Sequence, residues 1–131
     1  MASDSEPRTL RARYVVGADG LRSIVGRRLD LVRTSRIWPR RIALVTHYRE
    51  VQGVTDMGEM HVEHDGYFGI VEVGAGVMNV AIVVPISRAR EIGTDKTGFF
   101  ERWIASRPHL AERFVGAERI RPVRATGPFA T

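Results

Sequence analysis

Four runs of β-forming residues between positions 42 and 85 limit the folds that are open to this chain. The runs are 42–51, 59–63, 67–73 and 78–85. Asp65 and Gly66 separate the second run from the third, and an Asp-Gly pair in this position is a strong hairpin signal. Gly74, Ala75 and Gly76 separate the third run from the fourth. Because short turns join antiparallel neighbours, the pattern predicts a four-stranded antiparallel meander.

The period of the apolar residues changes after position 87, where helical spacing replaces alternation. Apolar side chains three to four positions apart predict one long amphipathic helix over about 95–115: Phe99, Phe100, Trp103, Ile104, Leu110 and Phe114. Thr94 or Asp95 can cap its start, and Pro108 is expected to break or kink it. Residues 119–124 add one candidate strand. The predicted fold class is therefore α+β, a mainly antiparallel sheet of four to five strands with a long C-terminal amphipathic helix.

The composition excludes several kinds of protein. The chain has 131 residues, which suits one domain with a real core, and it has no cysteine. Disulfides, thiolate zinc sites and cysteine nucleophiles are therefore excluded, and a reducing, cytoplasmic location is expected. No apolar run approaches the roughly 18 residues of a membrane helix, so no membrane span is expected. The polar, acidic start of the chain does not resemble a signal peptide.

The charges are unevenly distributed along the chain. Residues 1–41 carry ten basic and four acidic side chains, residues 42–87 one and six, and residues 88–131 nine and five. A nucleic-acid-binding protein often presents one continuous basic face, whereas here an acidic centre separates two basic ends. We therefore expect no nucleic-acid partner and keep nucleic-acid binding as the weakest alternative.

The strongest local signal is the segment from Tyr14 to Ser23. The pattern predicts a short strand over 10–16, a glycine-bearing turn and a helix over 21–30. Free N–H groups at such a helix start favour a phosphate or pyrophosphate. Gly17 and Gly20 would allow close approach, Asp19 could accept from a ribose hydroxyl or hold the turn, and Ser23 could donate to a phosphate oxygen. The alternative for Asp19 and Gly20 is a capped turn and nothing more.

The sequence Gly17-Ala18-Asp19-Gly20, followed by Ser23, resembles the Asp-Gly motif of the flavoprotein monooxygenase and geranylgeranyl-reductase-like superfamily. That superfamily has the para-hydroxybenzoate hydroxylase fold. The resemblance implies that the motif lies near the pyrophosphates of FAD and of NAD(P)H. The arginine usual in the motif is replaced by Gly26, with Arg27 next to it. The cofactor-binding candidates are Gly17, Asp19, Gly20, Ser23 and Arg27.

The resemblance extends more loosely over residues 40–49, 58–62, 66–70 and 79–85, which are similar to the sheet at the base of the active site in that superfamily. It implies a small, apolar or aromatic substrate, and the substrate-side candidates are His47, Tyr48 and His61. No catalytic residue is assigned. The histidines could instead be metal ligands, but positions 61 and 64 lie on opposite faces of a strand, so no metal site is expected.

The resemblance also implies a domain organisation. Residues 1–9 form a disordered tail, 10–33 the end of an FAD-binding domain, and 34–131 a truncated substrate domain. Enzymes of the superfamily carry an earlier Gly-x-Gly-x-x-Gly motif and a later Gly-Asp motif, so we expect an internal fragment that does not retain FAD by itself. The expected function is that of a segment of an FAD- and NAD(P)H-dependent oxidoreductase. The alternative is a stand-alone ligand-binding or dimerisation module, with a homodimer formed through exposed apolar surface.

Overall fold

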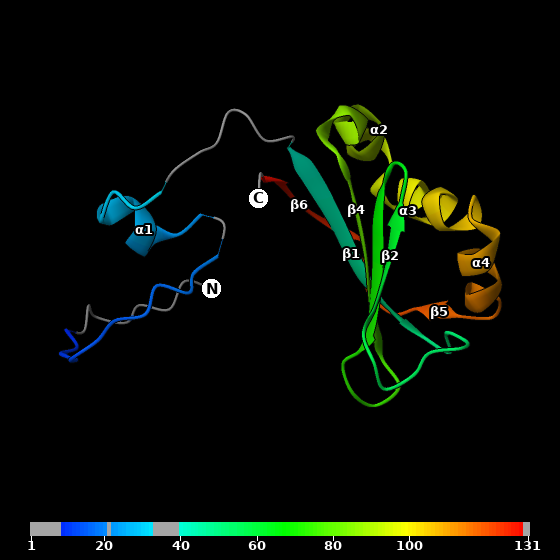
Figure 1. Cartoon of the computed structure of the whole chain (residues 1–131), viewed down its shortest axis with the longest axis horizontal. Helices are drawn as coiled ribbons and strands as arrows, with labels where there is room; N and C mark the ends of the chain where they lie inside the picture. The colour runs from blue at the N-terminus through cyan, green and yellow to red at the C-terminus, as the bar shows by residue number, and fades with distance from the viewer. Residues whose placement is uncertain (1–8, 21, 33–39, 130–131) are drawn as a thin grey trace, which may run out of the picture. The chain divides into compact units, whose positions relative to one another are not determined.

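The computed structural model describes residues 9–20, 22–32 and 40–129 and divides the chain into two units, Met1–Thr34 and Ser35–Thr131 (Figure 1). Residues 1–8 of the predicted tail lie outside the described residues. Each unit is described by itself.

The first unit contains one short helix, α1 (Ile24–Arg28), which is shorter than the helix predicted over 21–30. Ser23 caps its start, and Asp30, at φ 53°, follows its end. The strand predicted over 10–16 is wrong, because the described residues of this segment form no strand and Val16 is 85% exposed. A strand needs a neighbour for its N–H and C=O groups, and the described part of this unit offers no second strand.

The second unit is built on a six-stranded sheet in which every pairing is antiparallel. Its strands are β1 (Arg41–Arg49), β2 (Glu59–Glu63), β3 (Gly66–Glu72), β4 (Met78–Pro85), β5 (Glu118–Arg119) and β6 (Arg124–Phe129). The order is β2-β3-β4-β1-β5, and β6 also pairs with β1. The predicted meander is confirmed for β2, β3 and β4, but its fourth strand, β1, pairs with β4 and not with β2, the next strand in the sequence. The single last strand predicted over 119–124 is two strands, which brings the total to six.

Short helices cover one face of the sheet (Figure 1). They are η1 (Ile86–Arg88), α2 (Ala89–Thr94), α3 (Lys96–Ala105), α4 (Pro108–Ala111) and η2 (Glu112–Phe114). The prediction of one long helix over 95–115 is wrong. Arg107 is extended, at φ −123° and ψ 99°, and Pro108 lacks the N–H that would continue the ladder of α3. No helix in the described part of the chain is long and apolar enough to cross a membrane.

The core lies between these helices and one face of the sheet. The burial of β1 alternates strictly from Arg41 to Tyr48, so that every second side chain is buried, as expected of a sheet with one covered face. Buried strand residues meet the aromatic face of α3 in one cluster, whose fully buried members include Leu44, Phe68, Val80, Ile82, Phe100 and Leu110. The sheet therefore has a covered face beneath the helices and an open face opposite.

Candidate functional site

The turn before α1 is held by its own side chains. Asp19 Oδ2 accepts hydrogen bonds from the N–H groups of Ile24 (2.6 Å) and Val25 (3.3 Å), and Ser23 Oγ accepts from the N–H of Gly26 (2.8 Å). A hydrogen bond with the Ser23 side chain, supported by those backbone N–H groups, lowers the pKa of Asp19 below its ordinary value. The first amides of α1 are therefore occupied, which differs from the free amides expected for a phosphate site.

The two glycines of this turn have different environments. A Cβ at Gly17 would lie 2.8 Å from Val25 Cγ1, so that glycine lets the chain pack against α1. Gly20 has φ 76°, and no other atom of the described residues lies within 4 Å of where its Cβ would stand. Arg27 is exposed in the last turn of α1. An exposed Asp19 carboxylate beside an open Gly20 fits a hydroxyl donor, such as a ribose or ribityl chain, better than a phosphate.

The three substrate-side candidates do not lie on the same face of the sheet. His47 is half-buried on the open face, between Thr46 and Tyr48, whose buried side chains point to the covered face. Tyr48 packs against Phe114 with ring centroids 5.0 Å apart at 82°. His61 is also on the covered face, where its ring meets Phe68 at 5.6 Å.

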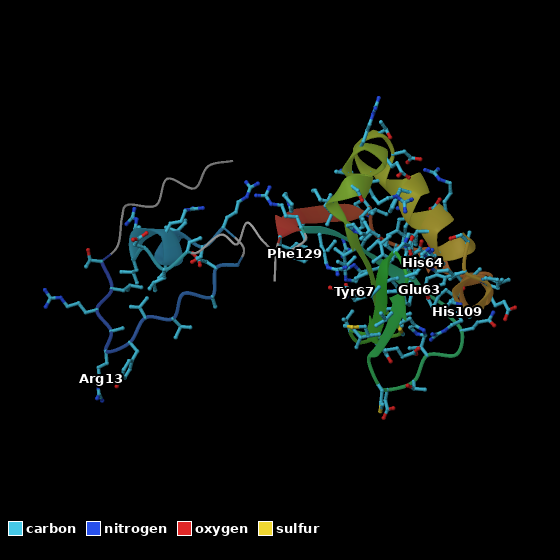
Figure 2. The ribbon with its side chains drawn as sticks, turned by 45° about the horizontal axis from the view of Figure 1, so that its top comes forward. Arg13, Glu63, His64, Tyr67, His109 and Phe129 are labelled. Atoms are coloured by element: carbon cyan, nitrogen blue, oxygen red, sulfur yellow. The ribbon has the colours of Figure 1, made fainter. Side chains whose placement is uncertain are left out.

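The open face contains polar residues that the sequence analysis did not single out. Asn79 of β4 lies directly opposite His47 of β1. On its other side, Asn79 lies opposite Val71 of β3. Tyr67 extends from the same face of β3, away from Glu63 and His109 (Figure 2). Around these polar groups the open face carries several small or apolar side chains, namely Ala43, Val45, Met60, Val62, Gly69 and Ala81. Arg124 and Thr126 of β6 lie on the same face, opposite Val45 and Ala43. Strand pairing could have placed Asn79 beside His47, but only with the register known.

The covered face holds a network of charges at the β2–β3 hairpin. His61 Nε2 lies 2.9 Å from Glu59 Oε2, His109 Nε2 lies 3.1 Å from Glu63 Oε1, and the two imidazole rings are 5.9 Å apart. Arg107, 8% exposed, lies on the ring of Trp103 and pairs with the hairpin acids. Within the residues that the structure describes, no three histidine or carboxylate side chains are arranged to hold a metal ion.

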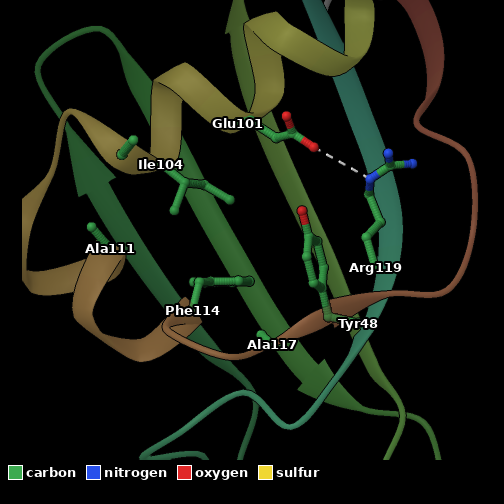
Figure 3. Close-up of a pocket in the computed structure, with 8 residues that line it drawn as sticks. Tyr48, Glu101, Ile104, Ala111, Phe114, Ala117 and Arg119 are labelled. Atoms are coloured by element: carbon green, nitrogen blue, oxygen red, sulfur yellow. Dashed lines mark ion pairs between the residues drawn. The ribbon is translucent and has the colours of Figure 1, made fainter.

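A cavity of about 400 Å³, open to solvent on one side, lies beneath the helices of the covered face (Figure 3). It is bounded by α3, by the α4–η2 segment, by β5 and by Tyr48 of β1. Arg119 Nε lies 3.5 Å from Glu101 Oε1 at one end. A second cavity, of about 280 Å³, is lined mostly by charged side chains that already pair with one another, including Asp65, Arg88 and Glu91.

The known proteins to which this chain is similar are described as FAD-binding or flavin-dependent proteins. A family model described as an FAD binding domain matches residues 1–112. Similar solved structures include CmlS, a flavin-dependent halogenase, with TM-score 0.68 and 18% identity over 79% of this chain and 20% of that chain. A flavoprotein/dehydrogenase from Cytophaga hutchinsonii has a TM-score of 0.66 and 22% identity, over 79% of this chain and 26% of that chain. The halogenase PltM in complex with phloroglucinol and FAD has a TM-score of 0.60 and 14% identity, over 79% of this chain and 25% of that chain.

These structural likenesses show a shared fold. The chain spans only 20% to 26% of the length of those three proteins. No match is found among curated proteins.

Proposed function

The chain belongs to the family of FAD-binding domains, and on this premise we propose that it is part of an FAD-dependent oxidoreductase that uses NAD(P)H and acts on an apolar or aromatic small molecule. The observation that carries the proposal is the sheet with one open face, on which His47 and Asn79 lie side by side next to small and apolar residues. Bound FAD would supply the redox chemistry, accepting a hydride from NAD(P)H and passing electrons to oxygen or to an alkene.

The turn before α1 supports a cofactor-side role. Asp19 is exposed and ionised, and Gly20 leaves open space, so a hydroxyl group of FAD can donate to the carboxylate. Ser23 and Gly17 hold this turn against α1, and Arg27 is exposed, so it can approach a phosphate from solvent. We assign Asp19 and Gly20 to direct contact, Gly17 and Ser23 to positioning, and Arg27 to charge neutralisation.

The open face supports a substrate-side role. His47 and Asn79 are paired across β1 and β4, so their side chains can hold one polar group of a substrate. The apolar residues around them can contact the rest of that molecule and exclude water. We therefore retain His47 as a proposed substrate-side residue, with Asn79 as its partner, whereas Tyr48 and His61 lie on the covered face.

FAD binding is the direct test, because an association between FAD and the turn can be measured without a substrate. We expect added FAD to lose fluorescence on binding to the purified chain and to separate from it during gel filtration. Asp19→Asn should weaken the affinity about tenfold, since the amide cannot accept as a charge does. The matched control is Asp30→Asn, an exposed aspartate after α1 at φ 53°, a conformation that asparagine tolerates.

Two results would contradict the FAD-side assignment. One is unchanged FAD fluorescence at saturating protein. The other is an equal loss of affinity in Asp19→Asn and Asp30→Asn, which would mean that the turn makes no specific contact.

Self-association is a second candidate function, favoured by the exposed edge of the open face. Met60 is 70% exposed and Val62 is 82% exposed, and both extend from β2, the outermost strand of the sheet order. Neighbouring apolar side chains of this kind, on a strand with one free edge, favour contact with a second copy.

A further inference from the structure

The cavity beneath the helices has no part in the function proposed above. Its residues lie on the covered face of the sheet, whereas His47 and Asn79 extend from the open face. We propose that this cavity is a second small-molecule site, which binds a neutral aromatic compound carrying one hydroxyl group.

The cavity exists because of two features of the sequence. The chain turns sharply between α3 and α4 at Arg107 and Pro108, so the two helices do not continue along one axis. Three alanines, Ala105, Ala111 and Ala117, line the space that this turn leaves. Larger side chains at these positions would fill it. The resulting volume of about 400 Å³ lies within the range of about 300–1,000 Å³ of small-molecule sites.

The inner boundary of the cavity suits an aromatic ring. Ile104 is 4% exposed and Tyr48 is 7% exposed, so both side chains are held in place by the core around them. The ring of Tyr48 is edge-on to Phe114 and stacked at 6.5 Å with Phe100. A further ring placed among these groups can make the offset or edge-to-face contacts that aromatic pairs favour.

The outer end of the cavity is polar. Figure 3 shows the Tyr48 hydroxyl pointing toward Glu101 and Arg119. Arg119 Nε is buried, and within the described part of the chain it has no hydrogen-bond partner, because Glu101 lies at an ion-pair distance of 3.5 Å only. Burial, together with the charge of Glu101, raises the pKa of Tyr48, so its hydroxyl stays protonated and can donate.

Glu101, Arg119 and Tyr48 determine which polar group of a ligand can bind at this end of the cavity. A hydroxyl can donate to the Glu101 carboxylate and accept from Arg119 Nε or from the Tyr48 hydroxyl. A carboxylate ligand would meet the negative charge of Glu101, and a cation would meet Arg119, so a neutral group is favoured. The site thus combines an apolar, ring-shaped interior with one hydroxyl-sized polar end.

Phenol is the probe, and toluene, which has a methyl group in place of the hydroxyl, is its matched control. We expect phenol to shift the amide NMR resonances of Ile104, Ala111 and Ala117 in the ¹⁵N-labelled chain. Toluene should bind about fivefold more weakly, the loss expected for one hydrogen bond. Tyr48→Phe keeps the ring and should weaken phenol binding toward the toluene value, while leaving toluene binding unchanged.

Ala111→Leu fills the cavity and should reduce phenol binding at least tenfold. Its control is Ala89→Leu, the same change at a partly buried alanine that lines another cavity. Folding of each variant is checked by its amide spectrum. The proposal is overturned if phenol shifts only resonances of the open face, if toluene equals phenol in affinity, or if a folded Ala111→Leu variant binds phenol as the unmodified chain does. Each of these results is independent of FAD binding.

Discussion

The guanidinium of Arg113 donates two hydrogen bonds to the carboxylate of Glu59, from Nη1 to Oε2 at 2.7 Å and from Nη2 to Oε1 at 2.8 Å. The pair joins η2 to β2, 54 residues apart in the sequence. Arg113 also donates to the backbone oxygens of Gln52 and Gly53. One side chain therefore attaches the helical segment to the edge strand and to the loop before it.

Removing this side chain should destabilise the fold. Arg113 and Glu59 are 16% and 26% exposed, so Arg113→Ala leaves a partly buried carboxylate and two carbonyls without their donor. We expect a loss of about 2 kcal/mol in the free energy of unfolding. Arg102→Ala, whose side chain is 68% exposed and pairs with Asp95, is the control and should change it by less than about 0.5 kcal/mol. Urea denaturation measures both, and equal losses would refute the role of Arg113.

The same pair predicts an acid-sensitive contribution to stability. The hydrogen bonds from Arg113, aided by His61, lower the pKa of Glu59 from its ordinary 4.5 to about 2. Because the folded state holds the proton less tightly than the unfolded state, the contribution is complete above about pH 4.5 and is lost as the pH falls toward 2. Glu59→Gln should flatten the pH dependence of unfolding in this window. Glu91→Gln, which breaks an exposed pair with Arg88, should flatten it less.

Gly66 is required by close packing of the backbone. At φ 156°, a Cβ there would overlap the carbonyl oxygen of Val83 on β4. Gly66→Ala should therefore cost about 2 to 3 kcal/mol of stability. Gly93, in α2, has no atom of the described residues within 4 Å of its Cβ position, so Gly93→Ala should stabilise the chain by up to about 1 kcal/mol. Thermal unfolding of the two variants gives the comparison, and similar midpoints would contradict it.

Arg107 is expected to be the most sensitive arginine of the second unit. It stacks on Trp103 at 3.4 Å, donates to the Trp103 carbonyl and pairs with Glu63 and Asp65. Arg107→Ala should cost about 3 kcal/mol, because it removes the buried guanidinium between two partly buried carboxylates. Glu63 then keeps its contact with His109, and Asp65 keeps the 3.5 Å contact with Arg88. Arg90→Ala, at an exposed position of α2, should be close to neutral. Denaturant titration distinguishes the two, and a small effect at Arg107 would show that the stacked guanidinium is dispensable.

Self-association through the open face can be tested with one charge. If copies meet at β2, Val62→Lys should shift sedimentation from dimer to monomer at matched concentration, because a buried unpaired ammonium is costly. Val115→Lys, at a residue that is 68% exposed outside the sheet, should leave the dimer unchanged. A monomeric unmodified chain at high concentration would remove this candidate.

The sequence was sufficient to predict β2, β3 and β4, because their turns are short and local. Asp65 and Gly66 mark the hairpin, and alternation marks the strands. The pairing of β5 and β6 with β1 was not predictable in the same way. Thr46 Oγ1, for example, donates to the carbonyl of Arg121, 75 residues away, and no local pattern encodes that contact.

The candidate site was only partly predictable, for a geometric reason. Alternation shows that His47 and Tyr48 point to opposite faces, but not which face the helices cover. That choice depends on where the apolar side of α3 packs, a tertiary contact. The arginines of the covered face were missed, because nothing in the local sequence distinguishes Arg107 and Arg113 from the many exposed arginines.

The alternation of β1 has an evolutionary consequence. The strand is paired on both edges, with β4 on one side and β5 and β6 on the other, so its register is firmly held. Positions 42, 44, 46 and 48 belong to the core, and positions 43, 45 and 47 belong to the open face. Natural variation can therefore exchange the odd-numbered side chains without repacking the interior, so one stable scaffold can be adapted to different molecules.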